Sequence, residues 1–163
     1  MTTQDLATYP SKGNRQQLDR RWLSLLHREG LPPFAGGVPQ PPVELGLAIA
    51  ELNQGQYWQC HETLERIWLP EHYPLRLFYH GLIKAAVGLL HLERHNRHGA
   101  LVKLRDAEYT LAPFRPRFMC VDNERLRRDV MERLAFLPES GPVNWEAIDR
   151  LPRVRFLHSR RGR

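Results

Sequence analysis

The sequence is poor in cysteine. Its two cysteines, Cys60 and Cys120, stand far apart in 163 residues, and no CxxC motif is present. This spacing argues against the disulfide framework of small secreted domains and fits a reducing compartment. We therefore expect a cytoplasmic protein that contains no disulfide bond.

Long apolar runs are also missing. Residues 1–17 contain no apolar segment of the kind that a secretion signal requires, so we expect no signal peptide. The longest apolar stretch, from Leu82 to Leu92, is interrupted by Lys84 and His91. It is too short and too polar to span a bilayer, so we expect no membrane segment.

Several motifs of common enzyme classes are absent from the sequence. There is no glycine-rich phosphate-binding loop and no GxSxG nucleophile motif. The positions of serine and cysteine suggest no catalytic triad. These absences favour a binding or structural role over catalysis, and no catalytic residue is predicted.

The positive charge of the chain is carried almost entirely by arginine. There are 24 Lys and Arg against 18 Asp and Glu, a formal net charge of +6, and the lysines are Lys12, Lys84 and Lys103. Six arginines crowd between Arg150 and Arg163. We interpret this stretch as a solvated basic tail with few apolar anchors. Non-specific attraction to RNA is the weaker alternative, and we expect no sequence-specific nucleic-acid binding.

The apolar residues recur at helical spacing along most of the chain. They predict a single all-α domain over residues 15–151, after a flexible lead (1–14) and before the basic tail (152–163). Helices are expected near residues 16–29, 42–53, 56–68, 75–93, 97–111, 122–136 and 144–151, between proline, glycine and asparagine breaks. The segment Leu75–Glu93 is apolar on most faces and should be the central buried helix. No segment alternates with period two, so we expect no sheet.

Two segments resemble each other at an offset of forty residues. Leu52 aligns with Leu92, Cys60 with Ala100, and Leu64 with Leu104. This pattern predicts two helical hairpins, each with a tight turn and a small residue where its helices approach, similar to tetratricopeptide-type packing. On the central helix, Gly81, Ala85 and Gly88 form a stripe of small residues that should let another helix come close.

The candidate site centres on the motif His61-Glu62-Thr63-Leu64-Glu65. His61 and Glu65 are one helical turn apart and share a face, and this pair of ligand types can chelate a transition metal. If the next helix runs antiparallel, His80 and Lys84 should lie opposite them. The candidate metal ligands are therefore His61, Glu65 and His80, with a divalent transition metal as the candidate cofactor. A wider ligand-binding set adds six residues: Tyr57, Trp58, Glu62, Trp68, Lys84 and His91.

Two alternatives stay open at this point. His61 and Glu65 could form a structural hydrogen-bonded pair, with Lys84 only neutralising a carboxylate, and the aromatic residues could belong to the core. The whole domain could also be a non-catalytic interaction module, since arginine and aromatic residues are common anchors of protein interfaces.

The residues from about Leu45 to Ala112 resemble the DUF309 family. The resemblance rests on a glycine turn (Gly55), an aromatic pair (Tyr57-Trp58) and an HExLExxW motif from His61 to Trp68. It continues through five further motif elements: Arg76, Phe78, Gly81-Leu82-Ile83, His91-Leu92, and Asn96 with Gly99-Ala100.

The resemblance implies an all-helical fold and brings no established activity, cofactor or substrate. Two residues depart from the family pattern. His80 stands where the family usually has Gln, which is a poor metal ligand. His95 stands where it usually has Gly, so a left-handed backbone there would cost about 1 kcal/mol.

Overall fold

The computed structural model describes residues 15–156, so the predicted lead over residues 1–14 lies outside the described residues. The prediction of an all-α fold is confirmed. The helices are α2 (Arg15–Glu29), α3 (Val43–Asn53), α4 (Tyr57–Trp68), α5 (Leu75–Glu93), α6 (Arg97–Leu111), α7 (Asn123–Ala135) and α8 (Trp145–Asp149), with a short 3-10 turn η1 at Ala112–Phe114. Within residues 15–156, every helix is too short or too polar to span a lipid bilayer.

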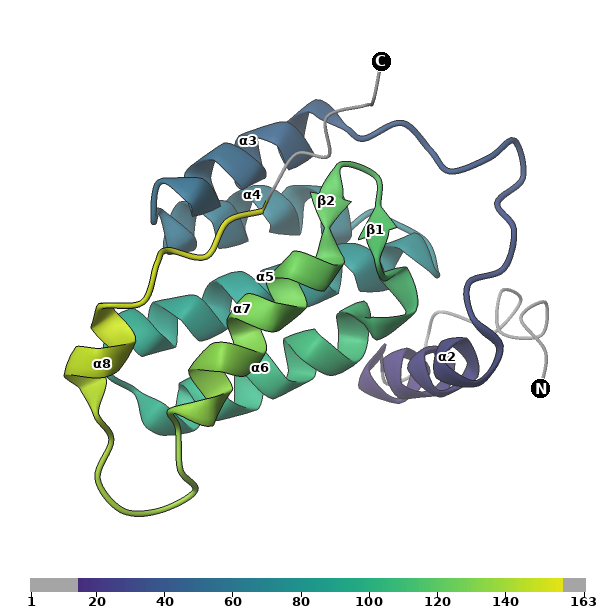
Figure 1. Cartoon of the computed structure of the whole chain (residues 1–163). Coiled ribbons are helices and arrows are strands. Elements are labelled where there is room, and N and C mark those ends of the chain that lie inside the picture. Colours follow the sequence, from purple (N-terminus) through teal and green to yellow (C-terminus); the bar gives the residue numbers. More distant parts are fainter. Residues whose placement is uncertain (1–14, 157–163) are drawn as a thin grey trace.

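Helix α5 is the central element, as its apolar sequence predicts. It packs against α4 on one side and α6 on the other, while α3 packs against α4 and α7 against α6 (Figure 1). The buried side chains of α5, which include Phe78, Leu82 and Leu89, face neighbours on most sides of the helix. The remaining helices can therefore be understood as layers around α5.

Two glycines on α5 allow α6 to pack close to it. A Cβ atom at Gly81 would lie 2.6 Å from the side chain of Leu111, and one at Gly88 would lie 2.6 Å from the side chain of Leu104. The backbone nitrogen of Leu104 would be only 3.2 Å from that Gly88 Cβ. The predicted role of the small-residue stripe is thus confirmed for these two glycines.

The turns of the two hairpins repeat at the offset of forty residues. Gly55 and His95 both have a left-handed backbone, with φ of 76° and 52°. The N–H of Gly55 donates to Leu52 O at 2.9 Å, and the N–H of His95 donates to Leu92 O at 3.0 Å. The chain thus uses one turn geometry twice, with glycine in the first copy and histidine in the second.

The prediction that the chain contains no sheet is wrong at one point. Strands β1 (Arg117–Phe118) and β2 (Val121–Asp122) form an antiparallel hairpin between η1 and α7. Each strand has only two residues, which is too short for a period-two pattern to be recognised in the sequence. The hairpin buries Phe118 and Val121 and brings α7 back over α6.

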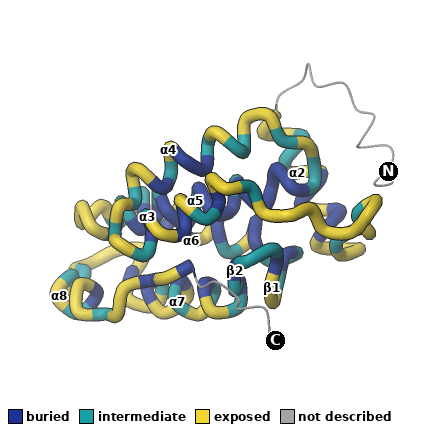
Figure 2. Tube along the Cα trace, turned by 90° about the horizontal axis from the view of Figure 1, so that it is seen from above, coloured by how far each residue is buried: buried dark blue, intermediate teal, exposed yellow. Residues whose placement is uncertain are grey.

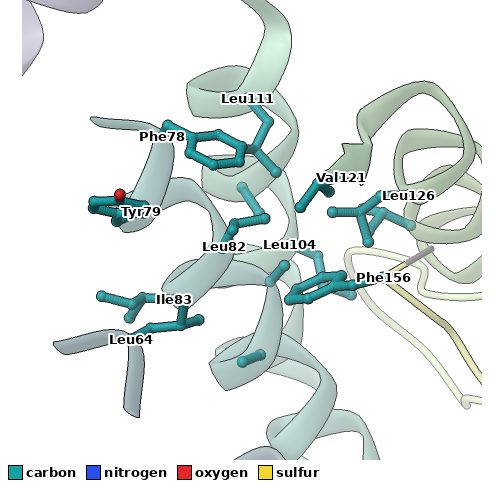
Figure 3. Close-up of a cluster of buried hydrophobic side chains, with 14 of the residues drawn as sticks. Leu64, Phe78, Tyr79, Leu82, Ile83, Leu104, Leu111, Val121, Leu126 and Phe156 are labelled. Atoms are coloured by element: carbon teal, nitrogen blue, oxygen red, sulfur yellow. The ribbon is translucent and has the colours of Figure 1, made fainter. Parts of the chain in front are cut away.

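The segment after α8 packs on the core, in contrast to the solvated tail expected over residues 152–163. Val154 and Phe156 are buried, whereas Arg153 and Arg155 between them are exposed. Asn53 fixes the end of this segment, because its side chain accepts from Phe156 N at 2.9 Å and donates to Phe156 O at 3.2 Å. Figure 3 shows the Phe156 ring in the same cluster as Leu104 and Leu126. Residues 157–163 lie outside the described residues.

Candidate functional site

The motif residues His61 and Glu65 form a pair on α4, as their spacing predicts. His61 Nε2 lies 3.0 Å from Glu65 Oε1, and the centroid of the Trp58 ring lies 5.1 Å from that of His61. The side chain of His61 is 17% exposed and that of Glu65 is 41% exposed. The pair therefore sits at the surface and is not sealed in the core.

The orientation of α4 follows from the residues on its opposite face. Cys60 and Leu64 are fully buried against the core. Thr63 is also buried, and its hydroxyl donates to Glu51 Oε1 on α3 at 2.6 Å. These contacts fix the rotation of the helix, so the face that carries the motif points outward. Figure 2 shows α4 buried along one side and exposed along the other.

The outward face of α4 carries a continuous stripe of side chains, which we call the α4 stripe. Its members are spaced by three or four residues, so they lie along one side of the helix. Trp58 and Leu69 are 51% and 55% exposed and stand at its two ends. Between them lie the half-buried His61 and Glu65 and the exposed Glu62. The stripe is therefore apolar at its ends and acidic in the middle.

His80 does not join this stripe. Its Nδ1 lies 3.5 Å from Asp19 Oδ2 on α2, and its ring stacks on Trp68 with 4.8 Å between the centroids. Trp68 also receives the guanidinium of Arg76, which lies 4.4 Å from the ring centroid. Trp68 is therefore held between two other side chains and serves packing at the end of α4.

Lys84 also points away from the motif. Its Nζ donates to the hydroxyl of Thr110 on α6 at 3.1 Å. Burial lowers the pKa of Lys84, while the charges of Asp106 and Asp19 partly oppose that change. The prediction that His80 and Lys84 lie opposite His61 and Glu65 fails, because His80 contacts α2 and the end of α4 and Lys84 contacts α6.

Asp19 is the centre of a polar cluster that the sequence reasoning missed. It accepts a short hydrogen bond from the hydroxyl of Tyr73 and lies beside His80. Burial alone would raise the pKa of Asp19, but the contacts of His80 and Tyr73 and the nearby charges of His80 and Lys84 lower it overall. Burial and the bond to Asp19 in turn raise the pKa of Tyr73.

A signal for this cluster exists in the sequence. Asp19 stands three and seven residues before the buried Trp22 and Leu26, so it lies on the apolar face of α2. A carboxylate on such a face needs hydrogen-bond partners. The sequence thus indicates that Asp19 needs such partners, although it does not indicate which helix supplies them.

The remaining predicted residues lie elsewhere. Tyr57 is half-buried beside Arg153 and the end of α5. His91 packs over Gly99 and lies 3.2 Å from the side chain of Asn96. Burial first, and then the nearby charges of Lys103 and Arg94, lower the pKa of His91. Neither residue belongs to the α4 stripe.

The predicted set of three metal ligands is divided between two places. His61 and Glu65 are together on α4, whereas His80 is committed to Asp19. Over residues 15–156, no three side chains of His, Cys, Asp or Glu converge in the manner of a metal site. The motif therefore offers two adjacent donor atoms rather than a complete coordination sphere.

The fold and the site together define a domain of two stacked helical hairpins with an exposed aromatic and acidic helix face. Residues 45–102 match the model of the DUF309 family, a domain of unknown function, and the assignment made from the sequence is confirmed. This match spans α3, α4 and α5 and the first part of α6. No curated protein and no solved structure is detectably similar to the chain.

Proposed function

We propose that this DUF309 protein is a non-catalytic binding domain that recognises a protein partner through the α4 stripe. The observation that carries the proposal is the exposure of Trp58 and Leu69 at the two ends of the His61–Glu65 pair. Tryptophan is enriched among residues that dominate interface energetics. The indole of Trp58 is half exposed although the opposite face of α4 is packed on the core. It is therefore a suitable anchor for a partner.

The apolar ends supply the expected driving force. Covering the exposed half of Trp58 removes roughly 100 Å² of apolar surface, which contributes about 2.5 kcal/mol before the costs of association. Covering Leu69 adds a smaller favourable free energy of the same kind. These two contacts suit a short segment of a partner rather than a large flat interface.

The acidic middle of the stripe indicates the chemistry of that segment. Glu62 and Glu65 place two carboxylates between the apolar ends, and Glu65 is already paired with His61. A segment with Lys or Arg between two apolar residues would complement this pattern. We therefore propose a basic, amphipathic segment of a protein as the partner.

The test is site-specific crosslinking followed by direct binding. A photoreactive residue at the exposed Gln59, beside the stripe, should crosslink a segment that has basic residues between apolar ones. The purified segment should bind the chain at least tenfold more weakly after Trp58→Ala. It should also bind more weakly after Glu62→Lys, and a charge reversal in the segment should restore binding.

Val102→Ala provides the matched control, because Val102 is an exposed apolar residue on α6. This variant should bind as the unmodified chain does. Crosslinked products that persist unchanged in Trp58→Ala, or a bound segment that is acidic, would contradict the proposal. So would equal affinity of Trp58→Ala and Val102→Ala.

A metal ion at the motif is the second candidate function. The 3.0 Å separation of His61 Nε2 and Glu65 Oε1 suits two donor atoms on one ion. The remaining ligands would come from solvent, from a partner, or from His80 if it left Asp19. Metal analysis of protein purified without a metal-affinity tag should then find one equivalent of zinc, manganese or iron, lost in His61→Ala. Substoichiometric metal with no thermal shift on adding these ions would contradict this candidate.

A further inference from the structure

A hollow of about 180 Å³ lies between the start of α4, the end of α5, α7, α8 and the C-terminal segment. Its apolar lining comes from Leu89 and Leu92 of α5, Ile148 of α8 and Leu151 of the segment that follows. Its polar lining consists of Tyr57, Glu93, Arg133, Asp149 and Arg153. Figure 1 shows how α8 and the segment after it close this side of the molecule.

Arg133 is a buried cation whose charge is not neutralised by direct contact. Its side chain donates to the carbonyl oxygens of Asp129, at 3.1 Å, and Pro152, at 2.5 Å. The residue is only 6% exposed, and within residues 15–156 no carboxylate lies within ion-pair distance of its guanidinium. Burial lowers the pKa of Arg133, which reflects the cost of keeping this charge out of water. These bonds use two of its five N–H groups.

Arg153 brings a second guanidinium to the same hollow. It lies against the turn between α3 and α4, where a Cβ atom at Gly55 would be 3.2 Å from Arg153 Cζ. Like Arg133, it has no ion-pair partner in the described part of the chain. Two cations thus line the hollow without a carboxylate bonded to either.

The carboxylates of Glu93 and Asp149 line the same hollow but form no ion pair with these two arginines. Asp149 is paired with His95, whose Nε2 lies 3.0 Å from its Oδ2. Glu93 makes no ion pair with any residue between 15 and 156. Burial raises the pKa of the Tyr57 phenol, which also responds to the charges of Arg153, Glu93 and Arg133 and so lies among them.

This arrangement selects against ligands of a single charge. A simple anion attracted by the two arginines would meet Glu93, and a simple cation attracted by Glu93 would meet the two guanidinium groups. A molecule with both charges can contact the arginines and Glu93 at the same time. The volume equals that of about six liquid water molecules, which suits a molecule the size of a small amino acid.

We propose that this hollow is a binding site for a small zwitterion that carries a carboxylate and an ammonium group, such as a free α-amino acid. The carboxylate contacts the guanidinium groups of Arg133 and Arg153. The ammonium group faces Glu93, and the Tyr57 hydroxyl supplies a further hydrogen bond. This site is independent of the α4 stripe, so Trp58→Ala should leave it unchanged.

The test measures thermal unfolding of the whole chain with each common free amino acid at about 10 mM. At least one should raise Tm by a few degrees, because a ligand in excess over its Kd stabilises the folded state. Acetate and ethylamine, which carry one charge each, should give no comparable shift. Shifts as large with acetate or inorganic phosphate would overturn the assignment of a zwitterion, as would the absence of a shift with any amino acid.

Variants at the exposed Arg153 and Glu93 locate the site, since neither change removes a buried contact between charged groups. Arg153→Gln and Glu93→Gln should each weaken binding of the stabilising amino acid at least tenfold. Arg155→Gln is the matched control, because Arg155 is exposed two residues further on and does not line the hollow. Unchanged affinity in both site variants, or equal loss in the control, would overturn the proposal.

Discussion

Asp19 ties α2 to the central helix through a single carboxylate. It accepts from Tyr73, which leads into α5, and it lies beside His80 on α5 itself. Helix α2 lies outside the segment that matches the family model, so this cluster joins the family core to an element outside it. A half-buried carboxylate held in this way contributes through its partners, since without it Tyr73 would lose a hydrogen bond and His80 a neighbouring negative charge.

Asp19→Asn should therefore lower the free energy of unfolding by about 1–3 kcal/mol at neutral pH. The pKa of Asp19 is lowered below its ordinary value of 3.8 in the folded chain. The stabilisation is thus fully present above pH 3.8 and is lost as the pH falls through the lower folded pKa. Denaturant unfolding across acidic pH should show a shallower loss of stability in Asp19→Asn than in the unmodified chain. Parallel pH profiles for the two proteins would contradict this role.

Residues with a local signal could be predicted from the sequence. Glycine is small wherever it stands, so Gly81 and Gly88 at helical spacing indicated a close helix contact. The left-handed backbone at His95 was suggested by its alignment with a glycine position, and the structure has φ of 52° there. The partner of His80 could not be predicted, because it depends on where α2 docks.

At the scale of elements, the spacing between α5 and α6 depends on the missing side chain at Gly88. Any Cβ atom there would collide with the side chain of Leu104 and come within 3.2 Å of its backbone nitrogen. The backbone of a neighbouring helix cannot rotate away as a flexible side chain can. The two helices would have to separate, and contacts along the whole interface would loosen.

Gly88→Ala should accordingly destabilise the fold by about 1–3 kcal/mol, in spite of the higher helix propensity of alanine. Gly46→Ala on α3 is the control, since a Cβ atom at Gly46 meets nothing within 4 Å. That change should stabilise the protein by about 0.5–1 kcal/mol. Thermal or urea unfolding of both variants measures the difference. Two variants that shift stability in the same direction would contradict this account.

Element boundaries followed from sequence more closely than contacts between elements. The span Leu75–Glu93 was predicted to the residue, because proline and polar breaks flank an apolar segment. The β1–β2 hairpin was missed because two-residue strands carry no periodicity. The packing after α8 was also missed, although Val154 and Phe156 alternate with Arg153 and Arg155 in the manner of an extended segment with one buried face.

At the scale of the whole molecule, the C-terminal segment completes the core. Phe156 is fully buried, and its backbone bonds to the side chain of Asn53 across the fold. The same segment supplies Arg153 to the hollow beside Tyr57. Its docking therefore links the stability of the core to the integrity of the proposed zwitterion site.

Phe156→Ala should lower the free energy of unfolding by about 3–5 kcal/mol, as expected for removing a buried aromatic side chain. Arg155→Ala, at an exposed neighbouring position, should change it by less than about 0.5 kcal/mol. Urea unfolding followed by tryptophan fluorescence measures both. Equal midpoints for the two variants would show that the segment after α8 contributes little to the core.

The contact between Asn53 and Phe156 also indicates the order in which parts of the chain fold. The hairpins α3–α4 and α5–α6 close over short turns, whereas this contact joins residues 103 apart in the chain. Closing so long a loop costs more entropy than closing a turn, and such contacts form slowly. A chain collapsing from the unfolded state should therefore assemble its hairpins first. The C-terminal segment would then dock last, and the hollow that it borders would exist only in the final, fully folded species.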